Sequence, residues 1–192
     1  MRKNGKAILI LGCLLIVCSL ALLLFLRFRS TQAERVNTEI VQTMETLLTD
    51  RRDGAKDFDR DSEMPALELH GADFIALLEI PAYGLKLPVC SMWDKEAVMS
   101  YPCRFYGSTY DGTLIVGGYD QAGQFDFFDR IQDGAAVTVT DMTGSTFSYA
   151  VALVERSDSA QAEILLDDTA DLTLFVRDAQ GLEYILLRCV AK

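Results

Sequence analysis

The chain has 192 residues and a formal net charge of −10 at pH 7, with 18 basic and 28 acidic side chains. This length accommodates one domain of about 100–200 residues and a small additional segment. Residues 1–29 hold five of the basic side chains and none of the acidic ones, so the remainder carries a net charge of −15. Because an acidic domain repels phosphate backbones, nucleic acid is disfavoured as a partner.

An apolar run without charge extends from Ala7 to Leu26. A helix needs roughly 20 such residues to cross the hydrocarbon core of a membrane. A cleavable signal peptide is the alternative, but the run continues into Arg27-Phe28-Arg29 without a small-x-small cleavage site. We therefore expect residues 1–29 to form an N-terminal tail and a single-pass signal anchor. Basic residues flank the run on both sides, so charge alone does not set its orientation.

The next segment, residues 30–66, combines a helical pattern with a linker. Apolar side chains recur at helical spacing at Val36, Ile40, Met44 and Leu47. This amphipathic pattern is typical of either a stalk or a helix packed on the domain. The charged stretch from Arg51 to Pro65 contains Gly and Pro and shows no period, which indicates a linker.

From residue 67 to residue 192 the pattern changes to short β-prone runs separated by turn residues. The predicted strands are Phe74–Ile80, Leu85–Val89, Thr113–Val116, Ala136–Thr140, Thr146–Glu155, Leu172–Val176 and Tyr184–Val190. Two short helical segments are predicted, one at Lys95–Met99 after a capping Asp94 and one at Phe125–Arg130. Strands this short and closely spaced predict an all-β barrel or sandwich.

Cysteine and histidine usage limits the chemistry of this domain. Three cysteines lie outside the apolar run: Cys90, Cys103 and Cys189. An odd number permits at most one internal disulfide and leaves one thiol free. His70 is the only histidine, so we predict no zinc site and no cofactor. We interpret the adjacent acids Asp167-Asp168 as a solvated loop rather than a calcium site.

A series of motifs between Phe74 and Val190 follows one order. They are Ile75–Val89 with its Ile-Pro and Leu-Pro-Val steps, Pro102–Ser108, Thr113–Gly118, Asp133–Val137, Thr140–Phe147, Leu172–Phe175 and Leu187–Cys189. This ordered set resembles the sortases, which are membrane-anchored extracytoplasmic cysteine transpeptidases of Gram-positive bacteria. The resemblance implies an eight-stranded β-barrel, and it implies a C-terminal domain on the extracellular side of the cell membrane.

Sortase chemistry uses a cysteine thiolate, a histidine and an arginine. The resemblance places the histidine position on Tyr119, the cysteine position on Arg177 and the arginine position on Tyr184. A guanidinium is not a nucleophile, and a phenol with a pKa of about 10 is a poor proton shuttle at neutral pH. The resemblance therefore implies a catalytically degenerate member of the family.

Two interpretations of these three side chains remain open. Either they are solvated or packed locally, or they meet in the former cleft. There, two phenols and a guanidinium can bind a carboxylate or a peptide carbonyl. In the second case the expected partners are a sorting-signal peptide, a cell-wall component or an active sortase.

Two other functions compete with a binding role. The first is a transpeptidase or hydrolase that uses relocated residues, with Cys90, Cys103 and Cys189 as its candidate nucleophiles outside the apolar run. The second is a scaffold that uses the fold alone. The resemblance also accepts cysteine at Cys103 and Cys189, which implies a possible disulfide between them.

Overall fold

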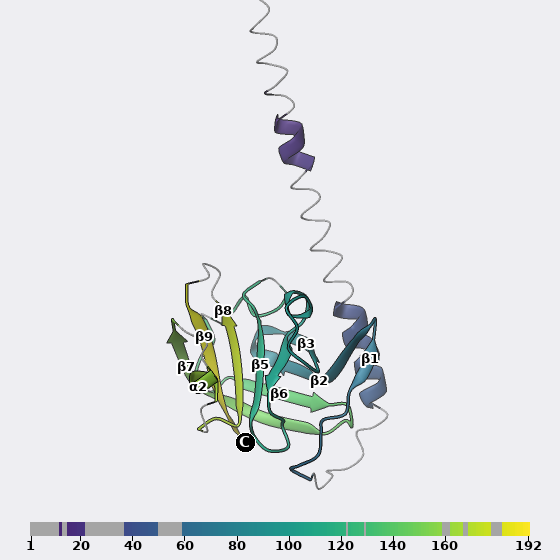
Figure 1. The fold of residues 1–192 in the computed structure, drawn as a ribbon, viewed down its shortest axis with the longest axis vertical. Helices are drawn as coiled ribbons and strands as arrows, with labels where there is room; N and C mark the ends of the chain where they lie inside the picture. Colours follow the sequence, from purple (N-terminus) through teal and green to yellow (C-terminus); the bar gives the residue numbers. More distant parts are fainter. Residues whose placement is uncertain are drawn as a thin grey trace, which may run out of the picture. The chain divides into compact units, whose positions relative to one another are not determined.

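The computed structural model describes residues 12, 15–21, 37–49, 59–121, 123–128, 130–158, 162–166, 169–177 and 182–192. The chain divides into two compact units, Met1–Val36 and Asn37–Lys192 (Figure 1). Within the first unit, residues 15–21 are helical. Across the described ranges, no helix is both long and apolar enough to cross a membrane. Most residues of the predicted anchor lie outside these ranges, and so do all of linker residues 51–58.

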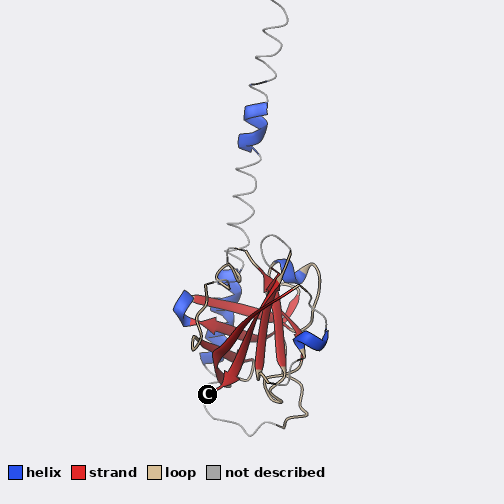
Figure 2. Ribbon diagram, turned by 90° about the vertical axis from the view of Figure 1, so that its left-hand side faces the viewer, coloured by secondary structure: helices blue, strands red, loops and turns tan. Residues whose placement is uncertain are grey.

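The second unit is built mainly from strands (Figure 2). They are β1 (Leu67–Leu69), β2 (Ala72–Ile80), β3 (Leu85–Cys90), β4 (Cys103–Tyr106), β5 (Leu114–Tyr119), β6 (Ala136–Asp141), β7 (Thr146–Ser157), β8 (Leu172–Arg177) and β9 (Tyr184–Ala191). The short helices are η1 (Pro81–Tyr83), η2 (Ala97–Met99) and α2 (Ala162–Leu165).

Eight of these strands close into a barrel. The sheet order is β1-β2-β3-β4-β5-β8-β9-β7-β6, and a further pairing joins β2 to β6. β1 pairs with the first residues of β2, whereas β6 pairs with Ala76–Glu79 further along the same strand. β1 is therefore an extension beside a closed barrel that runs from β2 to β6. This arrangement confirms the predicted all-β, eight-stranded barrel.

Alternation along β8 separates the barrel interior from its outer face. Leu172, Leu174 and Val176 belong to the buried core cluster, together with inward side chains of β2, β5, β6 and β9. Side chains of a strand alternate between the two faces of its sheet. Thr173, Phe175 and Arg177 consequently lie on the outer face of β8.

The helix at residues 37–49 packs on the barrel. Ile40 and Met44 are fully buried and Leu48 nearly so. The Lys86 ammonium on β3 contacts the Glu45 carboxylate of this helix and lies 3.3 Å from Glu79. Of the two arrangements that the amphipathic pattern allows, residues 37–49 therefore adopt the packed one.

The structure departs from the predicted elements in several places, and the short helices η1 and α2 were not among the predicted ones. β1 and β4 were not predicted, and residues 123–128 form successive turns rather than a helix. Phe125, Phe127 and Phe128 are all buried, at 0%, 3% and 1% exposure. A single helical turn cannot direct three such closely spaced rings to one side, which is why the chain turns irregularly there.

Candidate functional site

Tyr119, Arg177 and Tyr184 lie in one row across three neighbouring strands. Tyr119 ends β5 and pairs with Arg177, which ends the parallel strand β8. Arg177 pairs in turn with Tyr184, which begins the antiparallel strand β9. The structure thus brings together the three positions that the sortase resemblance singled out. We call them the polar row.

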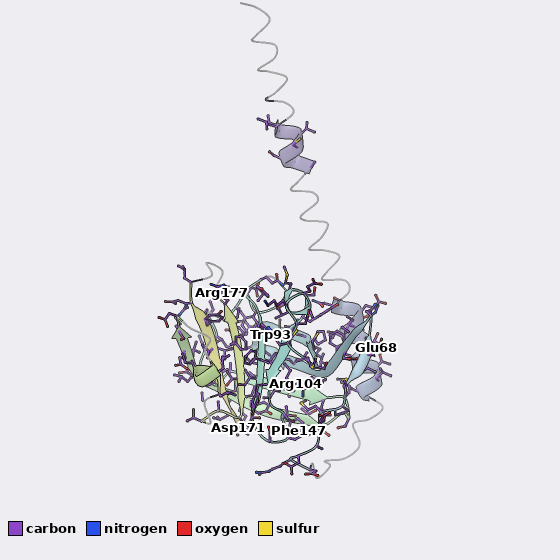
Figure 3. All side chains as sticks on the ribbon, in the orientation of Figure 1. Glu68, Trp93, Arg104, Phe147, Asp171 and Arg177 are labelled. Atoms are coloured by element: carbon purple, nitrogen blue, oxygen red, sulfur yellow. The ribbon has the colours of Figure 1, made fainter. Side chains whose placement is uncertain are left out.

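Arg177 is the middle residue of this row. It lies at one end of the barrel wall (Figure 3). Its Cζ atom is 5.8 Å from the centroid of the Tyr184 ring. Such a cation–π contact contributes about 0.5–1 kcal/mol at an exposed site. No described residue accepts a hydrogen bond from this guanidinium, and Tyr119 is 42% exposed. Arg177 and Tyr119 are therefore exposed, whereas Tyr184 is half-buried.

The polar row borders a cavity of about 270 Å³ on the outer face of β5, β8 and β9. The rest of the lining comes from Trp93, Phe105, Gly118, Leu165 and Phe175. We call this cavity the groove. A mostly apolar concavity with a few convergent polar groups is the usual form of a ligand site.

Three aromatic rings form one wall of the groove. Trp93 stacks on Phe175 with centroids 5.6 Å apart, and Phe105 meets both rings edge-on at 5.6 Å. Phe175 is buried, whereas Trp93 and Phe105 remain 38% and 39% exposed. Large exposed apolar side chains gathered in a concavity indicate a contact surface for a partner.

Two glycines before Tyr119 make room for this wall. A Cβ atom on Gly117 would lie 2.4 Å from Cζ of Phe175 and 2.5 Å from Cζ3 of Trp93. A Cβ atom on Gly118 would lie 2.6 Å from the ring of the buried Phe125. Gly117 therefore allows the aromatic wall to rest on β5, while Gly118 allows Phe125 to pack there.

Gln124 holds the end of β5 and was not identified from the sequence. Its side chain is almost fully buried. Oε1 accepts a hydrogen bond from the Tyr119 amide at 2.9 Å, and Nε2 donates to the Val98 carbonyl at 3.2 Å. Gln124 thus links the polar row to η2. The signal available in the sequence was a single glutamine directly before the aromatic run Phe125–Phe128.

Arg188 holds α2, which contributes Leu165 to the groove lining. This side chain is only 4% exposed, and its guanidinium donates to the carbonyls of Ile164 and Leu165, the latter at 3.2 Å. It also donates to Thr173 Oγ1 at 3.2 Å and to Glu155 Oε2 at 3.3 Å. Arg188 therefore ties α2 to the outer face of the barrel, which places Leu165 over the groove.

The cysteines outside the apolar run do not line the groove. Cys90, Cys103 and Cys189 are all buried, and burial raises the pKa of the Cys189 thiol to about 12. His70 is exposed in the turn between β1 and β2, at a positive φ of 53°. The relocated nucleophiles considered above therefore have no place in this site.

The predicted disulfide between Cys103 and Cys189 is wrong for this fold. Cys103 pairs with Gly117 on β5, and Cys189 pairs with Leu172 on β8. β5 and β8 lie between the strands that carry the two cysteines. The cysteines are therefore three strand spacings apart, or about 14 Å at about 4.8 Å per spacing. A disulfide requires Cα atoms within about 7 Å. Both residues are free thiols.

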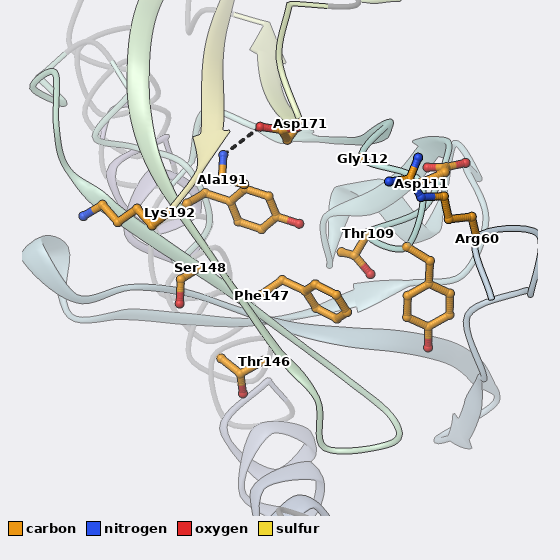
Figure 4. Close-up of a pocket in the computed structure, with 12 residues that line it drawn as sticks. Arg60, Thr109, Asp111, Gly112, Thr146, Phe147, Ser148, Asp171, Ala191 and Lys192 are labelled. Carbon is orange, nitrogen blue, oxygen red and sulfur yellow. Dashed lines mark hydrogen bonds between the residues drawn. The ribbon is translucent and has the colours of Figure 1, made fainter. Parts of the chain in front are cut away.

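A second cavity, of about 520 Å³, lies at the other end of β8 (Figure 4). Its lining includes Arg60, Asp111, Tyr149, Asp171 and Lys192. The carboxylates there serve local structure: Asp171 accepts from the Ala191 amide at 2.7 Å, and Asp111 accepts from the Thr113 amide and hydroxyl. Within the described part of the chain, no cluster of three or more His, Cys, Asp and Glu side chains can hold a metal ion.

No protein-family model and no curated protein matches the sequence. Solved structures do match. Sortase A from Corynebacterium diphtheriae, as a lid mutant, aligns with a TM-score of 0.57 and 17% identity over 82% of this chain and 94% of that chain. A sortase C from Clostridium perfringens with the C-terminal cell wall sorting motif aligns at 0.56 and 15% identity over 85% and 95%.

The sortase D5 transpeptidase of Clostridium perfringens aligns with a TM-score of 0.58 and 14% identity, over 80% of this chain and 99% of that chain. Identities this low carry the fold and not the activity. The agreement extends nonetheless over most of the chain and almost the whole of each solved domain. This protein has the sortase fold.

Proposed function

We propose that this protein is a non-catalytic sortase homologue, anchored in the cell membrane with its barrel outside, which binds an extended peptide that carries a carboxylate. The observation behind this proposal is the polar row. Tyr119, Arg177 and Tyr184 occupy adjacent positions on three strands at the border of an apolar groove.

The chemistry of the row supports binding rather than acyl transfer. Acyl transfer needs a nucleophile together with a group that exchanges a proton near neutral pH. The row contains a guanidinium, which stays protonated in proteins, and two phenols. Among the described residues that line the groove there is neither a thiol nor an imidazole.

A carboxylate suits the three donors of the row. The guanidinium of arginine presents its N–H groups in a fork that matches two carboxylate oxygens, and each phenol can donate one further hydrogen bond. The apolar wall beside the row suits side chains that precede the carboxylate. The sortase C structure noted above is described with a sorting motif, which supports a peptide as the ligand.

Trp93 is the only tryptophan of the chain and lines the groove, so its fluorescence reports binding. The probe is an N-acetylated apolar tetrapeptide with a free carboxylate, compared with its C-terminal amide. We expect saturable binding of the acid and a roughly 10- to 100-fold loss of affinity in Arg177→Gln, because a charged hydrogen-bond donor is removed. Equal affinity of Arg177→Gln and the parent for the acid would contradict the proposal.

A second experiment tests whether the groove keeps the geometry of an acyl-transfer site. Tyr119→His, Arg177→Cys and Tyr184→Arg together restore the sortase residue types. We expect this triple variant to form a slow covalent thioester with a sorting-signal peptide, seen as added mass on the intact protein, while the parent forms none. If the triple variant folds and stays unmodified, the groove is not a sortase cleft.

A further inference from the structure

A pair of cysteines flanks the loop that carries Trp93. Cys90 is the last residue of β3 and Cys103 is the first residue of β4, so residues 91–102 form the connection between them. The two cysteines stand opposite each other where β3 and β4 run parallel. The Cys90 amide also donates a hydrogen bond to the Pro102 carbonyl at 2.9 Å. The base of this loop is therefore closed by backbone pairing.

The two thiols share one buried site. Cys90 is 4% exposed and Cys103 is fully buried, and neither belongs to the core cluster inside the barrel. A hydrogen bond from one thiol to the other raises the pKa of Cys90, to which burial adds, and lowers the pKa of Cys103. Opposed residues on neighbouring strands lie about 5 Å apart. This separation falls within the range of about 4.4–6.8 Å that disulfides span.

We propose that Cys90 and Cys103 form a disulfide in an oxidising compartment and thereby close the loop of residues 91–102 covalently. The oxidant is a small-molecule disulfide. The Cys103 thiolate attacks one of its sulfurs and releases one thiol, and Cys90 then attacks the mixed disulfide and releases the second. Two protein thiols are oxidised, one external disulfide is reduced to two thiols, and the cysteine protons pass to the released thiolates.

This bond would fix both aromatic residues at the mouth of the groove. Trp93 lies three residues after Cys90, and Phe105 lies two residues after Cys103. Nε of Arg104 on β4 donates a hydrogen bond to the carbonyl of Ser91 in the loop at 2.7 Å. This hydrogen bond already joins the loop to β4. A disulfide at the base limits how far Trp93 and Phe105 can move apart. The disulfide would form whichever ligand the groove binds.

The experiment uses the full-length chain in a Cys13→Ser, Cys18→Ser background, which leaves only Cys90, Cys103 and Cys189. The protein is refolded with oxidised glutathione, denatured, alkylated and weighed intact. We expect only one thiol to be alkylated, and peptide mapping to link Cys90 to Cys103. Reduction should lower the unfolding midpoint by roughly 5–10 °C, because the cross-link restricts the unfolded chain.

Three further variants test whether Cys90 and Cys103, rather than Cys189, form the disulfide. In the background without Cys13 and Cys18, oxidation of the Cys189→Ser variant should still remove two thiols from alkylation. Oxidation of the Cys90→Ser variant should remove none. A Cys90→Ala, Cys103→Ala double variant should unfold near the midpoint of the reduced parent and show no change with glutathione. Alkylation of all three thiols in the refolded parent, or a link that involves Cys189, would overturn the proposal.

Discussion

At the level of single residues, Gly117 determines how closely the aromatic wall approaches β5. In Gly117→Ala the new methyl group meets Phe175 and Trp93 at about 2.5 Å, the separation that the built Cβ atom shows. We expect both rings to shift, with a loss of about 1–3 kcal/mol in the free energy of unfolding, as overpacking usually causes. Trp93 emission should change and peptide affinity should fall.

Gly118→Ala is the matched control, because its Cβ atom meets Phe125 rather than the groove rings. It should destabilise the barrel by a similar amount while Trp93 emission stays as in the parent. If Gly117→Ala and Gly118→Ala shift the Trp93 emission equally, the shift reflects a general loss of stability of the barrel. It would then not report a movement of the aromatic wall.

Arg188 and Arg156 offer a second matched pair on neighbouring strands. The Arg188 side chain is 4% exposed and contacts Glu155, α2 and β8. The Arg156 side chain is about half exposed and forms an ion pair at 3.6 Å with Glu183, which is also about half exposed. We expect Arg188→Met to lower the free energy of unfolding by about 1–3 kcal/mol, because carbonyls of α2 lose their donor. Arg156→Met should cost less than about 1 kcal/mol.

Urea denaturation of both variants measures this difference. Arg188→Met should also weaken peptide binding, since Leu165 of α2 lines the groove. Equal small losses for the two variants would mean that α2 holds its place without Arg188.

At the level of elements, Asp94 starts the turn that leads to η2. Its Oδ1 accepts hydrogen bonds from the amides of Ala97 at 2.8 Å and Glu96 at 2.9 Å. These bonds, that from Ala97 foremost, hold the pKa of Asp94 below its ordinary value. A carboxyl group with a lowered folded-state pKa stabilises the fold above its unfolded pKa, and this contribution disappears as the pH falls through the folded value.

We therefore expect the loop of residues 91–102 to loosen only below about pH 4, the ordinary range of an aspartate. Trp93 fluorescence in an acid titration measures this change. Asp94→Asn should abolish the local transition because asparagine caps equally well without titrating. Asp94→Ala should show the loosened spectrum at every pH. An acid transition that persists unchanged in Asp94→Asn arises from other carboxylates.

Much of the strand inventory could be predicted from the sequence, because alternating and β-branched runs indicate strands directly. β1 and β4 were missed since they are three and four residues long, too short for a period to emerge. The polar row followed from the resemblance, but its register depends on β5 and β8 pairing across more than fifty intervening residues. Gln124 and Arg188 also act through contacts between separate segments, up to 26 residues away for Gln124 and 33 for Arg188. The predicted bond between Cys103 and Cys189 failed for the same reason, since strand order decides which cysteines lie near each other.

At the level of the whole molecule, charge works against the proposed ligand at long range. The chain beyond residue 29 has a net charge of −15, so an anionic peptide approaches against repulsion. Salt screens this repulsion over a Debye length of about 8–10 Å near physiological ionic strength. We expect the association rate of the carboxylate peptide, measured by stopped-flow fluorescence, to rise with ionic strength. A rate that falls with salt would mean that attraction by the nearby Arg177 guanidinium outweighs the repulsion from the net charge.

The position of β9 between β8 and β7 has a consequence for synthesis of the chain. Of the barrel strands, β9 is the last to leave the ribosome, and it pairs with both neighbours along nearly its whole length. Until residues 184–191 emerge, β7 and β8 each have an unpaired edge, and open strand edges favour aggregation. Tyr184 belongs to that final strand. The groove therefore forms only after β9 has emerged, and a chain shortened before β9 has neither a closed barrel nor a complete groove.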